Sequence, residues 1–167
     1  MKKFKLTNNK KEWFGRTLYQ IESLINFGNI HVGDKGGFVE KEENLAQDGD
    51  AWVYDNACVY DNACVSGDAC VSGDARVFGN ACVYGDARVY GDASILWISK
   101  IGSRYDTTTV FRNKDGGLNV KCGCFCGTLE EFEAKVGETH GENKFGKEYK
   151  ALIALIKIHF EIGEDKQ

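Results

Sequence analysis

A six-residue alternation of apolar and polar positions dominates the middle of the chain. From Asp50 to Ile95 the sequence reads DAWVYDNACVYDNACVSGDACVSGDARVFGNACVYGDARVYGDASI. Alanine recurs at every sixth position from 51 to 93, Asp or Asn precedes each alanine, and Val or Ile follows two residues later. Side chains of a strand alternate between its two faces, so the alanine and the aliphatic residue of each hexad point inward together. The pattern predicts one short strand and one turn per hexad.

The turns and the repeat length together predict stacked coils. Gly, Asp and Asn between the strands suit tight turns, because they tolerate positive φ or bond their own backbone. Three hexads make a triangular coil of 18 residues, and successive coils stack at about 4.8 Å, the ordinary strand spacing. A single coil cannot bury its apolar side, but a stack can.

Different patterns flank the repeat. Residues 1–44 contain strand-like runs and turn glycines, which predict short strands that cap the first coil. Residues 102–167 predict a small ββαα module: strands over 107–112 and 118–122 joined by NKDGG, then two helices. Thr128 with Glu131 spells a capping box at the first helix. The second helix, about 146–161, is apolar on two faces, so it is either deeply buried or lies at an oligomer interface.

Three segments of this chain together resemble a group of phage and prophage β-helix proteins, often described as polymer-forming or transferase-like. They are TLYQIESLINFGNIHVGDKGGFVEKEENLAQDGDAWVYDNA, the GDARVYGDA repeats, and IGSRYDTTTVFRNKDGGLNVKCGCFCGTLEEFEAKVGETHG. The hexads resemble those of the left-handed parallel β-helix of hexapeptide-repeat proteins. The resemblance implies a mainly β chain with such a helix over residues 45–101, homotrimeric assembly, and a location in the cytoplasm of a bacterial host.

Composition narrows the function classes. The chain has 167 residues and a net charge of -4, which argues against broad binding to nucleic-acid phosphates. No apolar run approaches the roughly 20 residues that span a bilayer, and the basic start lacks the apolar core of a signal peptide. The seven cysteines, an odd number without a signal sequence, favour a reducing cytosol over a disulfide framework.

The segment GSRYDTTTVFR (102–112) is the most site-like part of the sequence. Guanidinium groups, hydroxyls and backbone donors can together bind an anion. The alternative is a polar connector followed by an ordinary β-branched strand. The candidate anion-binding residues, including two arginines of the hexads, are Ser103, Arg104, Thr107, Thr108, Arg112, Arg76 and Arg88.

A column of outward-facing residues suggests contact between subunits. Tyr60, Phe78 and Leu96 are spaced 18 apart and would stack on one face. Stacked aromatic residues can simply stabilise neighbouring strands, or they can be covered by another subunit. With the two-faced last helix, the interface candidates are Tyr60, Phe78, Leu96, Ile156 and Phe160.

Cysteine and histidine placement disfavours metal and acyl-transfer chemistry. Cys122, Cys124 and Cys126 form C-x-C-x-C, which differs from the C-x₂-C of zinc knuckles and would place all three on one side of a strand. Cys64 and Cys82 would be stacked neighbours without a histidine nearby. We expect no metal and no cofactor. The hexads hold no histidine to serve as the base of a hexapeptide-type acyltransferase, and His31, near the start of the repeat, is better explained as a turn residue.

We therefore expect a non-catalytic oligomeric protein that binds a small anionic ligand, such as a nucleotide, or a host protein. The phage resemblance implies sequestration of a host defence molecule. Two alternatives stay open: an acyltransferase that uses acyl-coenzyme A, and a structural or polymer-forming scaffold. The non-repetitive C-terminal module argues against a pure polymer.

Overall fold

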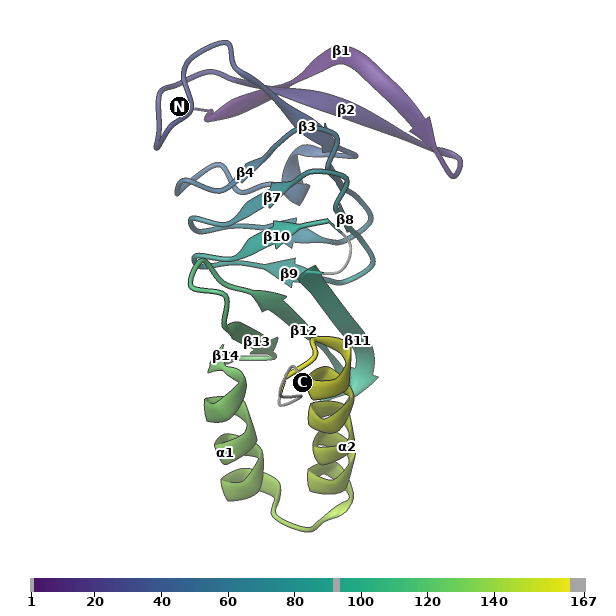
Figure 1. Cartoon of the computed structure of the whole chain (residues 1–167). Helices are drawn as coiled ribbons and strands as arrows, with labels where there is room; N and C mark the ends of the chain where they lie inside the picture. The colour runs from purple at the N-terminus through teal and green to yellow at the C-terminus, as the bar shows by residue number, and fades with distance from the viewer. Residues whose placement is uncertain (1, 92–93, 163–167) are drawn as a thin grey trace. The chain divides into compact units, whose positions relative to one another are not determined.

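The computed structural model describes residues 2–91 and 94–162. It divides into two compact units, Met1–Asp92 and Ala93–Gln167, each with its own buried core (Figure 1). The N-terminal unit contains, in chain order, β1 (Phe4–Trp13), β2 (Arg16–Ser23), β3 (Lys35–Val39), the 3₁₀ helix η1 (Glu42–Asn44), β4 (Trp52–Val53), β5 (Cys58–Val59), β6 (Cys64–Val65), β7 (Cys70–Ser72), β8 (Arg76–Val77), β9 (Cys82–Val83) and β10 (Arg88–Tyr90).

The left-handed parallel β-helix expected as the fold class is wrong. Across residues 2–91 and 94–162 the strands form four separate small sheets, mixed, parallel or antiparallel, and none is closed or coiled. The mixed sheet has the order β1-β2-β3-β5-β8, and the parallel sheets are β10-β7-β4 and β6-β9. The prediction assumed that the regular strands and turns of the hexads continue into one coiled architecture for the whole repeat. The hexad strands are only two or three residues long, whereas β1 and β2 are long antiparallel strands that the repeat does not anticipate.

Within the repeat, parallel strands pair residues 18 positions apart. Val53 pairs with Val71, and Val71 with Val89. The inward positions predicted from the alternation are buried: the described alanines of the repeat are at most 1% exposed, and its valines are fully buried. The turn position of each hexad has positive φ, whether it is a glycine such as Gly67 (φ +71°) or an aspartate such as Asp61 (φ +60°). The hexad therefore specifies local strands, turns and burial.

One column of glycines shows why the turn positions are restricted. A Cβ at Gly49 would lie 2.5 Å from the carbonyl oxygen of Gly67, and a Cβ at Gly67 would lie 2.8 Å from the backbone nitrogen of Gly85. These distances are too short for any side chain, so backbones at neighbouring turns approach each other directly.

The C-terminal unit is a four-stranded antiparallel sheet with two helices. It contains β11 (Ile95–Ile101), β12 (Asp106–Arg112), β13 (Leu118–Cys122), β14 (Phe125–Thr128), α1 (Leu129–His140) and α2 (Lys144–His159), with the strand order β11-β12-β13-β14. The predicted strand over 118–122 and the capping box of Thr128 with Glu131 are confirmed. The ββαα expectation missed β11 and β14. The hydrophobic core of this unit lies between the sheet and the two helices.

Candidate functional site

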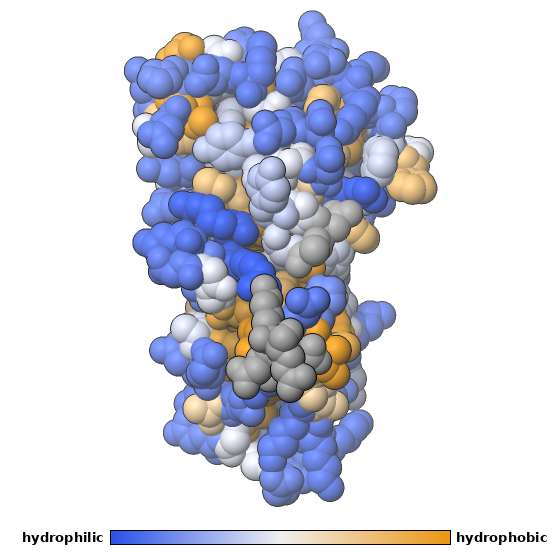
Figure 2. Space-filling model, in the orientation of Figure 1, coloured by the Kyte–Doolittle hydropathy of each residue, from blue (hydrophilic) through white to orange (hydrophobic). Residues whose placement is uncertain are grey.

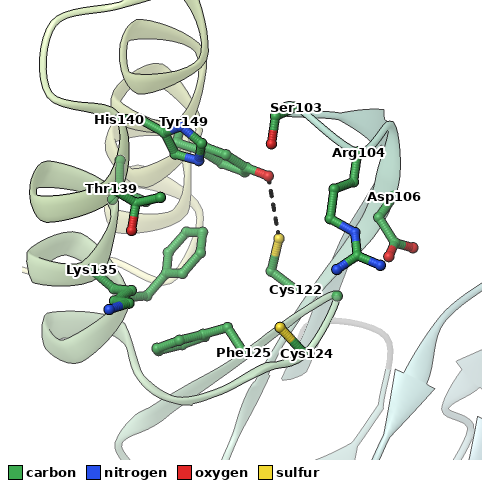
Figure 3. A pocket seen from close by; sticks show the side chains of 13 residues that line it. Ser103, Arg104, Asp106, Cys122, Cys124, Phe125, Lys135, Thr139, His140 and Tyr149 are labelled. Atoms are coloured by element: carbon green, nitrogen blue, oxygen red, sulfur yellow. Dashed lines mark hydrogen bonds between the residues drawn. The ribbon is translucent and has the colours of Figure 1, made fainter.

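A cavity of about 430 Å³ opens in the C-terminal unit, among the tips of two hairpins and the two helices (Figure 3). This volume lies within the range of small-molecule sites. The turn between β11 and β12 forms one wall, the turn between β13 and β14 lies below it, and α1 forms the opposite wall. Its lining residues are Ser103, Arg104, Asp106, Cys122, Gly123, Cys124, Phe125, Phe132, Lys135, Val136, Thr139, His140 and Tyr149.

The β11–β12 turn is held against α2 by close packing. Gly102 has a φ of +74°, and a Cβ there would lie 1.8 Å from the hydroxyl oxygen of Tyr149. The backbone N–H of Gly102 donates to the Glu148 carboxylate at 3.0 Å. Glycine is required here both by the backbone conformation and by the approach of the tyrosine. The neighbouring Ser103 and Arg104 are thereby placed at the edge of the cavity.

Aromatic rings give the cavity an apolar interior. The ring centroids of Phe125 and Phe132 are 5.3 Å apart, and Tyr149 meets Phe132 edge to face at 5.6 Å. His140 stacks on Tyr149 with centroids 5.6 Å apart. These spacings are typical of favourable aromatic pairs. The arrangement offers flat apolar surface to a ring-containing ligand.

A thiol and two hydroxyls form a polar group at the back of the cavity. The buried Thr108 hydroxyl donates to Cys122 Sγ at 3.1 Å, and the Tyr149 hydroxyl lies 3.5 Å from the same sulfur. Burial, together with the hydrogen bond to Cys122, raises the pKa of Tyr149 well above the ordinary tyrosine range. Tyr149 therefore stays neutral to a higher pH than an exposed tyrosine does.

The expected placement of the three neighbouring cysteines on one side of a strand is wrong. β13 ends at Cys122, the chain turns at Gly123 with a φ of +57°, and β14 begins at Phe125. Cys122 and Cys124 line the cavity, whereas Cys126 lies on the next strand, where it accepts a hydrogen bond from Lys121. In the part of the chain that the structure describes, no group of three or more His, Cys, Asp or Glu side chains could hold a metal ion.

Two cationic side chains stand at the cavity on opposite walls. Figure 3 shows Arg104 beside Asp106 on the hairpin side and Lys135 on α1. Lys135 also forms an exposed ion pair with Glu138 at 2.8 Å. Exposed pairs of this kind contribute little free energy, so the ammonium group can turn toward a ligand. The cavity thus combines apolar surface with positive charge.

The structure brings only some of the predicted anion-binding residues of segment 102–112 to the cavity. Ser103 and Arg104 line the cavity. Thr107 is half-buried and hydrogen-bonded to Ser99, and Thr108 is committed to Cys122. Arg112 points elsewhere: it donates to the carbonyl oxygens of Gly116 and Phe160, and its guanidinium lies 5.4 Å from the ring centroid of Phe160.

The two arginines predicted from the hexads lie in the N-terminal unit. Arg76, on β8, has its guanidinium 5.4 Å from the ring centroid of Trp13. Arg88, on β10, donates to backbone carbonyls, including that of Asp68 at 2.9 Å. They belong to different sheets and have separate neighbours.

The residues predicted to lie at a subunit interface belong to two different units of the structure. Tyr60 and Phe78 stack within the N-terminal unit, with centroids 5.1 Å apart and planes 4° apart. Leu96 packs against the core of the C-terminal unit, so the three do not form one column in a single sheet. Ile156 and Phe160 are buried in that same core.

Sequence reasoning missed the α1 wall of the cavity. Phe132, Val136 and His140 are spaced four apart, and Lys135 and Thr139 lie beside them on the same side of the helix. The sequence feature that could have indicated the α1 wall is the presence of these polar residues beside the apolar side of the helix. His140 is not visible as a site residue in the sequence, because its neighbour Tyr149 lies on another helix.

No protein-family model matches this chain, and no curated protein matches it. The resemblance to phage β-helix proteins therefore stays a prediction. None of the helices in residues 2–91 and 94–162 has the length and apolar character needed to cross a membrane.

Proposed function

We propose that the C-terminal unit binds a small anionic molecule that carries an aromatic or apolar ring, a nucleotide being the expected class. The observation that carries the proposal is the cavity itself, which Phe125 and Phe132 line together with Arg104 and Lys135. A ring would pack on the aromatic surface, and the anionic group would be held by both cations. Arginine suits this role because its fork of N–H donors matches phosphate or carboxylate oxygens.

The surroundings of the cavity thiol favour binding over catalysis. Cys122 contacts the hydroxyls of Thr108 and Tyr149. A nucleophilic cysteine needs a base or a cation in contact with it to form its thiolate, and the hydroxyls that contact Cys122 do not remove a proton near neutral pH. His140 lines the same cavity but stacks on the Tyr149 ring. In the proposed role the protein retains its ligand unchanged, which fits sequestration of a nucleotide signal in an infected bacterial cell.

Calorimetric titration with cyclic and linear nucleotides, ADP-ribose derivatives and coenzyme A tests the proposal. Arg104→Ala and Lys135→Ala should each weaken binding about tenfold, which corresponds to about 1.4 kcal/mol and to one hydrogen bond between charged groups. Lys150→Ala is the matched control, because Lys150 also forms an exposed ion pair, with Glu142, but does not line the cavity.

The outcomes separate the three functional hypotheses. Binding that is weakened about tenfold in each cavity variant and unchanged in the control supports the proposal. Absence of binding throughout, or binding indifferent to both substitutions, contradicts it and favours the scaffold. Turnover of a ligand would favour an enzyme, and selective binding of coenzyme A would favour the acyltransferase.

A further inference from the structure

Four hexads of the N-terminal unit carry a cysteine at the position between the alanine and the buried valine. They are Cys58, Cys64, Cys70 and Cys82. Cys64 and Cys82 are Cα partners in the pairing of β6 with β9, 18 positions apart. The register partners of Cys58 and Cys70 are aromatic residues and arginines. The fold therefore places one pair of these cysteines directly beside each other.

Backbone hydrogen bonds hold this pair in register. The N–H of Cys64 donates to the carbonyl oxygen of Ala81 at 3.0 Å, and the N–H of Ser66 donates to that of Val83 at 2.9 Å. The two bonds therefore lie on either side of Cys82. Neighbouring strands are about 4.8 Å apart, a separation within the roughly 4.4–6.8 Å between the Cα atoms of disulfide-bonded cysteines. Paired residues of adjacent strands also point to the same face of the sheet.

Nearby pairs show that side chains 18 positions apart reach each other on this unit. The Asn62 amide nitrogen donates to the amide oxygen of Asn80 at 3.3 Å. Tyr60 and Phe78 stack with their ring centroids 5.1 Å apart. The same spacing relates Cys64 to Cys82, so rotation about the Cα–Cβ bonds can bring their sulfur atoms together.

Both cysteines are accessible enough to react. They are present as thiols, and both are half-buried, whereas the valine after each of them is fully buried. Figure 2 shows a mainly hydrophilic surface on the visible face of the N-terminal unit, as expected for hexads whose apolar positions point inward (Figure 2). A small water-soluble reagent can therefore approach the outward positions of the hexads.

We propose that Cys64 and Cys82 are a redox modification site, where a reversible disulfide forms by exchange with a small-molecule disulfide such as oxidised glutathione. The thiolate of one cysteine attacks the reagent, forms a mixed disulfide and releases one small thiol. The thiolate of the other cysteine then attacks the protein sulfur of the mixed disulfide and releases the second small thiol. Two protein thiols are thereby oxidised to one disulfide, and the reagent is reduced to two thiols.

The surroundings of the pair predict a slow and reversible reaction. Burial raises the pKa of the Cys64 thiol, and the neighbouring Cys82 adds to this rise, so the reactive thiolate is scarce near neutral pH. Parallel side chains keep the Cβ atoms near the strand spacing, slightly more than the roughly 3.5–4.5 Å of a relaxed disulfide. The resulting strain makes the bond easier to reduce than a relaxed structural disulfide.

Peptide mapping of the full chain after incubation with oxidised glutathione tests the site. Trypsin cleaves after Lys41, Arg76 and Arg88, so Cys64 and Cys82 fall on the separate peptides 42–76 and 77–88. After alkylation of the remaining thiols, mass spectrometry without reduction should find these peptides joined. Treatment with dithiothreitol before digestion should separate them.

Serine variants identify the two sulfur atoms. Cys64→Ser and Cys82→Ser should each lose the joined peptide. Cys58→Ser and Cys70→Ser are the matched controls and should keep it, because they occupy the same hexad position without a cysteine as register partner. Circular dichroism checks that each variant is folded. A joined peptide that persists in Cys64→Ser or Cys82→Ser, or its absence from wild type at every glutathione ratio, would overturn the proposal.

Thermal unfolding gives a second readout. A disulfide between residues 18 positions apart restricts the unfolded chain, so oxidised wild type should melt at a higher temperature than reduced wild type. Cys64→Ser should melt at the same temperature under both conditions. An equal response of Cys64→Ser and wild type to the oxidant would contradict the assignment, and a joined peptide that dithiothreitol cannot separate would contradict its reversibility.

Discussion

Lys3 is a single buried charged residue that links two segments of the N-terminal unit. Its side chain is 1% exposed, and its ammonium group donates to the carbonyl oxygens of Asp48, Gly49 and Ala51 at 3.0 to 3.2 Å. Burial lowers the pKa of Lys3, although the nearby charges of Asp48 and Asp50 oppose this effect. A buried ammonium group is tolerated because three acceptors surround it. Lys3 thus fastens the start of the chain to the beginning of the repeat.

Replacement of Lys3 by methionine should destabilise the protein. The substitution keeps a long side chain but leaves the three carbonyls without this donor, so the free energy of unfolding should fall by about 1–3 kcal/mol. Lys2→Met is the control, because Lys2 is exposed and forms only a surface ion pair with Glu42. Urea unfolding measures both. Equal stability of the two variants would show that the buried hydrogen bonds contribute nothing.

Tyr149 gives a prediction for alkaline pH. Its pKa is raised in the folded protein by burial and by the hydrogen bond to Cys122. The neutral hydroxyl therefore contributes stability that is complete below the ordinary tyrosine pKa and is lost as pH rises through the raised value. Burial also raises the pKa of Tyr54 and Tyr60, so the wild type should show several tyrosines that titrate late, and Tyr149→Phe should show one fewer by tyrosinate absorbance. Ionisation of every tyrosine near the ordinary pKa would contradict the buried environment.

At the scale of elements, local patterns and long-range pairing have different consequences. The hexads specify short strands whose valines are buried, and the capping box specifies where α1 begins. The hexads do not specify which strands pair with each other. For example, β3 pairs antiparallel with β2 on one side and parallel with β5 on the other. A six-residue pattern contains no information about the flanking hairpin, so it could not predict a mixed sheet.

Val71→Asp tests the inward register at the centre of the repeat. Val71 is fully buried and lies between Val53 and Val89 on the neighbouring strands. An aspartate there would bury an unpaired charge, at a cost of about 3–5 kcal/mol, so cooperative thermal unfolding should be lost. Ser72→Asp, at the adjacent half-buried position, should have a small effect. A soluble Val71→Asp protein with unchanged melting would show that the register is wrong.

At the scale of the whole molecule, the two units have separate roles. The N-terminal unit consists of short sheets around the repeat, whereas the cavity belongs to the C-terminal unit. Trimeric assembly, implied by the resemblance to hexapeptide proteins, stays a prediction. The mass measured in solution tests it, because one copy of an 18.5 kDa chain differs clearly from three.

The sequence by itself determined the features that depend on neighbours along the chain. These are the buried valines of the hexads, the positive-φ turns such as that at Asp61, the N-cap at Thr128, and the two apolar sides of the last helix. Only the tertiary structure decided how the strands divide among four sheets, that Arg112 binds the end of α2 instead of facing a ligand, and that Lys135 and Arg104 line the same cavity. The physical reason is range: strand alternation, turn conformation and capping act within a few residues, whereas sheet partners and cavity walls come from segments tens of residues apart.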